Sequence, residues 1–336
     1  MPSAAARCVF ACFKRVERWG DRITGAAGPV FITLAVALFS GAALCFLDVI
    51  LPSLPWPVLT APPCLLIILN LFAHYYYACT ISPGFVDHPP EVGGGRLWAK
   101  KTRPRAHARG VSWSEELNVT PAAVTRCNKC GQAKPERAHH CRICNRCVLK
   151  FDHHCPNSRS SGINQCVGIN NERHFVLFMV YLVLGTFAFI VTGWPYVFDA
   201  MGFNYTQDTW TYFVPPVIYA MTTVLCLVMC LAVSVMLGWH LWSIAIGETS
   251  VESHDHDVYR SVARGRGESF INSYDLGKRK NLALFFNIGK GRYPWYTLIL
   301  PLRIPPYTDG RAWARRPGLE RHPGVRAGEE LTDDEE

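Results

Sequence analysis

Four long stretches without Lys, Arg, Asp or Glu divide this chain of 336 residues. They lie between Arg22 and Asp48, between Asp48 and Asp87, between Arg173 and Asp199, and between Asp208 and Glu248. Each stretch can hold a helix of about 20 apolar residues, the length that crosses a bilayer. Uniformly apolar runs satisfy their backbone polar groups best as helices surrounded by lipid, so core helices of a large soluble protein are the less favoured interpretation. The sequence therefore predicts an all-α integral membrane protein with four transmembrane helices.

The four helices are expected at about 29–47, 57–79, 175–197 and 213–239. These bounds divide the chain into five parts. They are the N-terminus (1–28), helices 1 and 2 (29–81), a linker with a cysteine-rich domain (82–174, core 127–174), helices 3 and 4 (175–246), and the C-terminal region (247–336). The three parts outside the helices are expected in the cytosol, for the reason given next. The polar composition of the tail from about residue 311 predicts disorder.

The basic residues indicate which side of the membrane each segment faces. Residues 1–28 hold five Lys and Arg, residues 80–174 hold fifteen, and the chain after Trp239 holds fourteen, which accounts for all 34. The two short loops around Asp48 and Asp199 hold none. The positive-inside rule therefore places both termini and the central segment in the cytosol. The net charge of +8 is then explained by an anionic membrane leaflet, and no nucleic-acid partner is expected.

Seven of the fourteen cysteines lie between Cys127 and Cys166. In the reducing cytosol, clustered cysteines are more often metal ligands or catalysts than disulfides. A gap of two residues lets a tight turn present both sulfurs to one ion, so three CxxC pairs interleaved with histidines predict tetrahedral zinc sites. Two such sites need eight ligands, and six cysteines with two histidines supply them. One cysteine remains. Counting does not say which, but a spare Cys155 beside histidine and aspartate would be typical of an activated nucleophile.

The run Asp152-His153-His154-Cys155 inside this pattern closely resembles the DHHC-type zinc-finger protein S-acyltransferases, the palmitoyltransferases. The resemblance covers most of the chain, including the four spans, the cysteine-rich domain between spans two and three, and the Asn170–Phe175 transition into span three. Three further motifs are similar to family elements: Thr249–Glu252 to TTxE, Asn272–Tyr274 to the C-terminal Asn-Pro-Tyr element, and Ser82–Gly84 to Asp-Pro-Gly.

The resemblance implies a protein-cysteine S-palmitoyltransferase that uses palmitoyl-CoA and works by a ping-pong acyl-enzyme mechanism. Cys155 would be the nucleophile, His153 its base and Asp152 the group that orients His153. The resemblance also implies supporting roles for Thr249, Glu252, Asn272 and Tyr274. Two structural Zn²⁺ ions would be held, one by Cys127, Cys130, His140 and Cys147, the other by Cys141, Cys144, His154 and Cys166.

The expected partners are the lipid bilayer, acyl-CoA, and cytosolic or peripheral membrane proteins with accessible cysteines. The family points to the endoplasmic reticulum, the Golgi or the vacuole. The acyl chain is expected among the spans. Lys150, Arg173 and Arg126 are candidates either for contact with the CoA phosphates or for contact with lipid headgroups.

One segment departs from the family pattern. Members typically continue from DHHC through Pro-Trp and three residues to the next cysteine, whereas this chain lacks the tryptophan and carries about five extra residues before Cys166. A polar insert at Asn157–Gly162 would be flexible, and a displacement of the thiol by roughly 1 Å can cost about a hundredfold in rate. Three interpretations of the insert remain open: a tolerated loop, an inactive relative, or an error in the predicted reading frame such as a retained intron. The alternative function is a catalytically impaired DHHC-like membrane zinc scaffold.

Two other zinc classes fit the sequence poorly. A membrane-bound RING-type ubiquitin ligase needs a long gap between its second and third ligands, and RING domains lack DHHC. A zinc protease is not favoured because no HExxH motif occurs.

Overall fold

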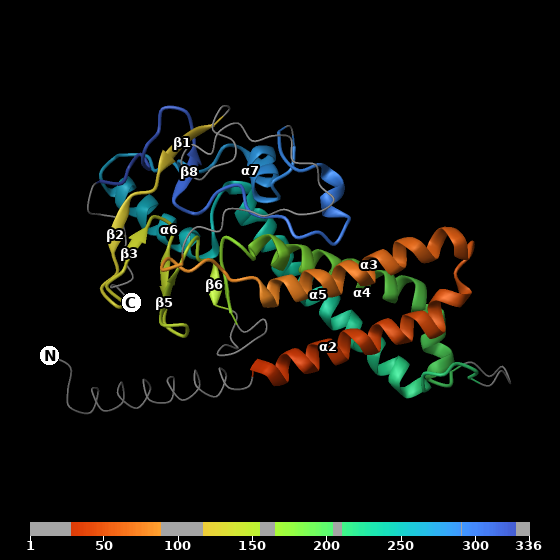
Figure 1. The fold of residues 1–336 in the computed structure, drawn as a ribbon. Coiled ribbons are helices and arrows are strands. Elements are labelled where there is room, and N and C mark those ends of the chain that lie inside the picture. The colour runs from red at the N-terminus through yellow and green to blue at the C-terminus, as the bar shows by residue number, and fades with distance from the viewer. Residues whose placement is uncertain (1–27, 89–116, 155–164, 204–209, 290, 327–336) are drawn as a thin grey trace, which may run out of the picture.

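A computed structural model describes residues 28–88, 117–154, 165–203, 210–289 and 291–326. Cys155, the Asn157–Gly162 insert and the segment 1–27 lie outside the described residues. Four long helices form one end of the molecule, and eight short strands with two shorter helices form a lobe at the other end (Figure 1). We call this second part the lobe.

The four predicted spans are present as four helices long and apolar enough to cross a membrane. They are α2 (Gly28–Cys45), continued by short π and 3₁₀ turns to Ser53, α3 (Pro57–Thr80), α4 (Glu172–Ala200) and α5 (Pro216–Ile246). Helix α5 begins at Pro216, three residues later than expected, because two successive prolines suit a first turn but not the interior of a helix. It runs seven residues longer than expected, to Ile246, and the next residue, Gly247, ends the helix with a φ of +77°.

The lobe contains strand pairs that the all-α expectation did not include. The antiparallel pairs are β1 (Asn118–Pro121) with β8 (Ala312–Arg315), β2 (Val124–Arg126) with β3 (Ala133–Pro135), β4 (His139–Cys141) with β5 (Arg146–Val148), and β6 (His153–His154) with β7 (Cys166–Val167). Helices α6 (Ser250–Gly265) and α7 (Lys278–Phe285) and the 3₁₀ turn η4 (Trp295–Leu298) complete it. The all-α class is correct for the membrane part, which contains most of the helical residues that the structure describes.

The tail predicted as disordered from about residue 311 is ordered as far as Arg326. Strand β8 pairs with β1, and the indole of Trp313 within it is fully buried. The prediction of disorder was wrong for this part of the tail, because it considered only the polar composition. One buried tryptophan and four paired residues are enough to order the tail against a strand nearly 200 residues away.

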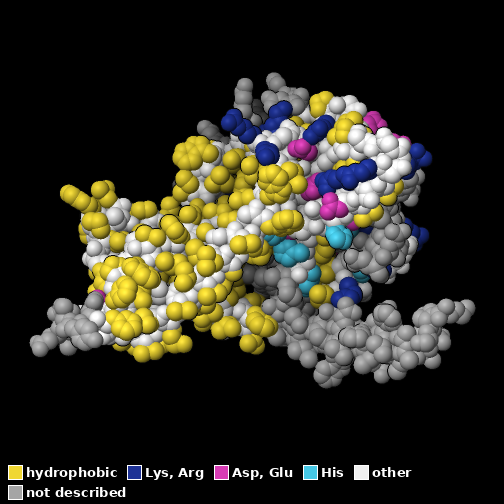
Figure 2. All heavy atoms as spheres, turned by 180° about the vertical axis from the view of Figure 1, so that it is seen from behind, with side chains coloured by type: hydrophobic (Ala, Val, Ile, Leu, Met, Phe, Trp, Pro, Cys, Tyr) yellow, Lys and Arg dark blue, Asp and Glu magenta, His cyan; other side chains and the backbone are white. Residues whose placement is uncertain are grey.

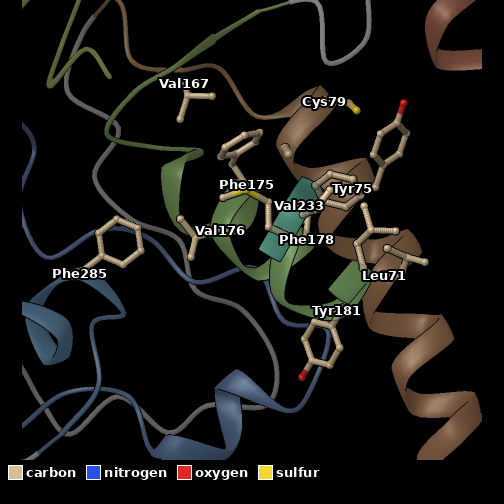
Figure 3. Packing of buried hydrophobic residues seen from close by; sticks show 13 residues of the cluster. Leu71, Tyr75, Cys79, Val167, Phe175, Val176, Phe178, Tyr181, Val233 and Phe285 are labelled. Carbon is tan, nitrogen blue, oxygen red and sulfur yellow. The ribbon is translucent and has the colours of Figure 1, made fainter. Parts of the chain in front are cut away.

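A core of aromatic and aliphatic side chains joins α3, α4 and α5 (Figure 3). Met179 is fully buried there, and Phe285 of α7 reaches into the same cluster from the lobe. Because lipid tails are as apolar as these side chains, close packing rather than exclusion of water holds the spans together. On the face shown in Figure 2 the surface of the spans is almost wholly apolar, and Lys, Arg, Asp and Glu gather on the lobe.

Candidate active site and metal centres

Two short hairpins bring the first predicted ligand set together. The donor atoms of Cys127, Cys130, His140 and Cys147 all lie within 4.8 Å of one another. His140 and Cys147 are directly paired across β4 and β5, and the Sγ atoms of Cys130 and Cys147 are 3.5 Å apart. A zinc ion with sulfur and nitrogen ligands has donor separations of about 3.5–3.8 Å at the edges of its tetrahedron. The four residues therefore fit a closed, structural zinc site.

The second ligand set converges in the same way. The donor atoms of Cys141, Cys144, His154 and Cys166 lie within 4.8 Å of one another. His154 pairs with Cys166 across β6 and β7, and its Nδ1 lies 3.2 Å from the Sγ atoms of both Cys141 and Cys166. These four donors also fit one tetrahedral ion, and no coordination position remains for Cys155.

Asp152 and His153 form a hydrogen-bonded pair beside the second metal site. The Nδ1 of His153 lies 2.7 Å from Oδ2 of Asp152, and because a carboxylate only accepts, Nδ1 carries the proton. The other carboxylate oxygen accepts the backbone N–H of Ser250 at 2.7 Å. Burial raises the pKa of Asp152, but the hydrogen bond from His153 outweighs it, so the pKa lies well below its usual range. The ionised carboxylate leaves Nε2 of His153 as the basic nitrogen of the ring.

A second histidine, His240 of α5, adjoins this pair and was missed by the sequence analysis. Its Nδ1 lies 3.6 Å from Oδ2 of Asp152, and its ring centroid is 5.6 Å from that of His153. The ring also packs against Phe175. The sequence does contain a feature that could have identified it, because His240 is the only histidine in the uncharged stretch 209–247. Polar groups inside spans are costly and commonly functional.

The Thr249–Glu252 motif caps the helix that faces Asp152. Thr249 Oγ1 accepts the N–H of Glu252, and a Glu252 carboxylate oxygen accepts the N–H of Thr249, which is a capping box at the start of α6. The capped first turn directs the N–H of Ser250 at Asp152. The positive end of the α6 dipole also favours the negative charge of that carboxylate.

The same Glu252 forms a buried ion pair with Arg137, which the sequence analysis did not single out. Arg137 binds both carboxylate oxygens at 2.5 and 2.6 Å, and its guanidinium stacks 4.2 Å from the Tyr274 ring centroid. Burial raises the pKa of Glu252, but the charge of Arg137 lowers it to about 2. Arg137 belongs to the zinc-binding segment, so this pair connects that segment to α6.

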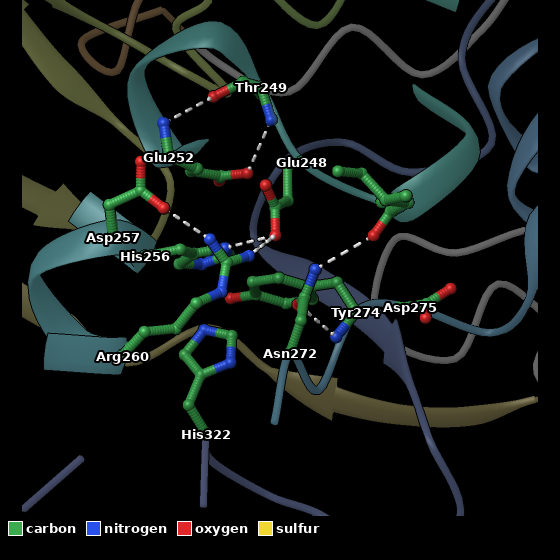
Figure 4. Close-up of polar contacts among 12 residues, drawn as sticks. Glu248, Thr249, Glu252, His256, Asp257, Arg260, Asn272, Tyr274, Asp275 and His322 are labelled. Carbon is green, nitrogen blue, oxygen red and sulfur yellow. Dashed lines mark hydrogen bonds and ion pairs between the residues drawn. The ribbon is translucent and has the colours of Figure 1, made fainter. Parts of the chain in front are cut away.

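Asn272 and Tyr274 brace the end of α5 close to this network (Figure 4). Asn272 Nδ2 donates to the carbonyl of Ile246, the last residue of the helix, and its Oδ1 accepts the N–H of Tyr274. The four residues predicted to support the site therefore form one connected layer against α5 and α6.

We expect Arg137→Met to lower the stability of the lobe by about 3–5 kcal/mol, because it leaves the buried Glu252 charge without its partner. The measurement is thermal unfolding of the purified protein in detergent. Arg146→Met is the matched control, since Arg146 binds Asp87 at 2.6 Å in a partly exposed pair that contributes about 0–1 kcal/mol. Equal melting shifts in the two variants would contradict the assignment.

Two of the three basic residues considered for CoA or headgroup contacts bind protein groups instead, Lys150 half-buried and Arg173 buried. Lys150 binds Glu172 at 2.5 Å, and Arg173 donates to two backbone carbonyls while it is only 3% exposed. Arg126 is exposed, and its Nε binds the carbonyl of Gly131. Lys150, Glu172 and Asp152 line a cavity of mixed polar and apolar character between α4, α5 and α7.

A second cavity, of about 110 Å³, lies among all four spans and has an almost entirely apolar lining. Helix α2, the π turn that continues it and α3 contribute Phe39, Phe46 and Leu71, and helices α4 and α5 contribute Leu182, Phe189 and Met229. The lining offers no charged group, so its ligand would have to be hydrocarbon in character.

Comparisons with known proteins find relatives that cover most of the chain. A family model described as DHHC palmitoyltransferase matches residues 123–257. Palmitoyltransferase ZDHHC16 of Mus musculus is 31% identical over 334 residues, covering 94% of this chain and 81% of the relative. Palmitoyltransferase ZDHHC16A of Danio rerio is 29% identical over 363 residues, covering 91% and 81%. Palmitoyltransferase ZDHHC3 of Homo sapiens is 38% identical over 165 residues, covering 46% of this chain and 52% of that protein.

Proposed function

This chain belongs to the DHHC palmitoyltransferase family and is a protein S-palmitoyltransferase, and we propose that Cys155 carries the acyl group between acyl-CoA and the substrate cysteine. One observation supports this assignment above the others. Asp152 fixes the His153 ring with Nε2 as its base, two residues before Cys155 in the chain. All eight proposed ligand positions are filled by other residues, so the Cys155 thiol is spare.

The proposed reaction exchanges one thioester for another. A free thiol has a pKa near 8.5 and is mostly protonated at cytosolic pH. His153 Nε2 takes the thiol proton, and the Cys155 thiolate attacks the carbonyl carbon of acyl-CoA. The carbon–sulfur bond to CoA breaks, and the CoA thiolate leaves with the proton from His153. The substrate thiolate then attacks the acyl-enzyme and releases Cys155. Neither ATP nor a redox cofactor is consumed.

The apolar cavity among the spans is the proposed place of the acyl chain. A buried methylene contributes roughly 0.8 kcal/mol, so a sixteen-carbon chain resists transfer to water by on the order of 10 kcal/mol. A cavity lined by Phe46, Phe189 and Met229 keeps the chain in an apolar environment while its thioester meets the nucleophile. Protein substrates approach from the cytosol, where acyl-CoA is found.

The two zinc ions are proposed to be structural, because each is enclosed by four protein ligands. Bound Zn²⁺ would cross-link the short hairpins and so hold the Asp152 segment in place. The distribution of Lys and Arg supports our proposal that both termini and the lobe face the cytosol. The family resemblance supports an endomembrane of the endoplasmic reticulum, Golgi or vacuole as the location. Neither the described structure nor the comparisons favour the alternative of an impaired zinc scaffold.

The test is to map the acyl group on the wild-type protein. Purified protein in detergent is incubated with labelled palmitoyl-CoA, digested, and analysed by mass spectrometry with and without hydroxylamine. We expect one hydroxylamine-sensitive palmitoyl group on the peptide that contains Cys155. Acylation of a different cysteine would overturn the site assignment. Absence of acylation in folded, zinc-loaded protein would favour the impaired scaffold.

A further inference from the structure

A short segment after α7, residues 295–302, lies along α3 and α4, although it belongs to the C-terminal region of the chain. We call it the apolar loop. It begins with η4 (Trp295–Leu298) and continues through Ile299, Leu300, Pro301 and Leu302. None of its residues is charged, and the sequence analysis assigned it only to the cytosolic region.

The membrane helices supply hydrogen-bond donors to the carbonyl groups of the apolar loop. Four side chains of α3 and α4 donate to four of its carbonyls: Arg173 to Thr297 at 3.0 Å, Tyr181 to Leu298 at 2.7 Å, Asn70 to Ile299 at 2.7 Å, and Tyr77 to Pro301 at 3.2 Å. Figure 3 shows the hydroxyl of Tyr181 pointing away from the apolar cluster, toward the C-terminal part of the chain. Asn70 is completely buried at its contact.

Four N–H groups of the loop bind carbonyls of the loop or of Pro294, the residue before it. Those of Thr297, Ile299, Leu300 and Leu302 bind carbonyls of Pro294, Tyr296 or Leu300, and Pro301 has no N–H group. Irregular backbone survives at membrane depth only where its polar groups find protein partners, because the hydrocarbon provides no water. Every carbonyl from Thr297 to Pro301 has a protein donor, which a loop in water would not need.

The position of Asn70 along α3 places the loop at the depth of the bilayer. Asn70 lies thirteen residues after Pro57, which is about 20 Å along the helix axis. Val58 and Leu59, at the Pro57 end, are 86% and 72% exposed, which suits the edge of the hydrocarbon. Since the hydrocarbon core is about 30 Å thick, Ile299 beside Asn70 falls inside it.

The outward side chains of the loop match this depth. Trp295, Tyr296, Ile299 and Leu300 are 67%, 37%, 41% and 37% exposed. The apolar surface of the spans continues onto the adjoining side of the lobe, with Lys and Arg side chains beyond it (Figure 2). At the end of α5, the Lys278 ammonium lies 4.5 Å from the Trp242 ring centroid, an aromatic and basic pairing typical of the headgroup region.

We propose that the apolar loop is inserted among the phospholipid acyl chains of the leaflet next to the lobe. It is then a membrane element in addition to the four spans. Insertion holds α7 and the lobe against the bilayer, because α7 leads into the loop and packs on α5. The occupant of the exposed face is therefore lipid hydrocarbon and not a protein partner.

Photo-crosslinking of the full-length chain tests this proposal. Benzoylphenylalanine replaces Trp295 in protein reconstituted into phosphatidylcholine–phosphatidylserine vesicles, and illumination is followed by mass spectrometry of the labelled peptide. The control positions are Leu69, 54% exposed on α3, and Val258, 41% exposed on α6 in the lobe. We expect phospholipid adducts at 295 and 69 and at least about tenfold fewer at 258. An adduct yield at 295 as low as that at 258 would overturn the proposal.

A matched pair of charge substitutions gives an independent result. Ile299 and Val258 are both 41% exposed, so a loop in water would tolerate aspartate equally at either position. We expect Ile299→Asp to lower palmitoyl transfer at least about tenfold, because the charge is placed in hydrocarbon, and Val258→Asp to remain within about twofold of wild type. Wild-type transfer by Ile299→Asp would contradict insertion. If that variant does not fold, the crosslinking result decides.

Discussion

Asparagine in place of Asp152 is expected to lower the rate of acyl-enzyme formation by about 10²–10⁴-fold. The Asp152 carboxylate accepts two hydrogen bonds, one on each oxygen, from His153 Nδ1 and from the N–H of Ser250. Asparagine has only one oxygen, so one of these donors must face an NH₂ group. Where the NH₂ group faces His153, Nδ1 has to accept a hydrogen bond, and the ring proton is then on Nε2. In that tautomer Nε2 cannot accept the thiol proton.

Single-turnover acylation with palmitoyl-CoA measures this effect, and its pH dependence separates it from misfolding. The variant should recover part of its lost rate as the pH rises above the thiol pKa of about 8.5, because the thiol then ionises without a base. A merely unfolded variant would not recover. Asp87→Asn is the control, since Asp87 is a half-exposed carboxylate that binds Arg146 away from the site. Acylation by Asp152→Asn at the wild-type rate would contradict the orienting role.

The sequence located the spans and the ligand sets because both are encoded locally. A charge-free run of 25 or more residues marks a span whatever surrounds it, so the four helices were found with only their ends displaced. The CxxC pairs place their sulfurs within reach of one ion by local turns alone. The division of the ligands into two sets came from the family resemblance, and strand pairs such as His140 with Cys147 now give it a geometric reason.

The contacts that the sequence did not reveal join residues far apart in the chain. His240 meets Asp152 across 88 positions, and Arg137 meets Glu252 across 115. Neither residue belongs to a periodic pattern, and their proximity depends on how α5 and α6 pack on the zinc-binding hairpins. The order of the tail around Trp313 has the same origin, since β8 gains its partner β1 only once the lobe has formed.

Serine in place of Cys147 is expected to remove one zinc ion per chain and to abolish acylation. Cys147 is fully buried in β5, and its Sγ lies 3.5 Å from that of Cys130. A serine hydroxyl is not a zinc ligand of comparable strength, because structural sites depend on thiolate and imidazole. The binding energy of a structural zinc is folding energy, on the order of 10–16 kcal/mol in small zinc domains. Strands of three residues cannot replace a contribution of that size.

The zinc content per chain is measured by elemental analysis of the purified protein, together with its melting temperature and its acylation by palmitoyl-CoA. Wild type should hold two ions, and Cys147→Ser one or fewer, with a lower melting temperature. Cys226→Ser is the matched control, because Cys226 is a buried thiol in α5 outside both ligand sets and should keep both ions. Two ions in Cys147→Ser would refute the ligand assignment. Loss of zinc with acylation retained would show that the ion does not hold the Asp152 segment in place.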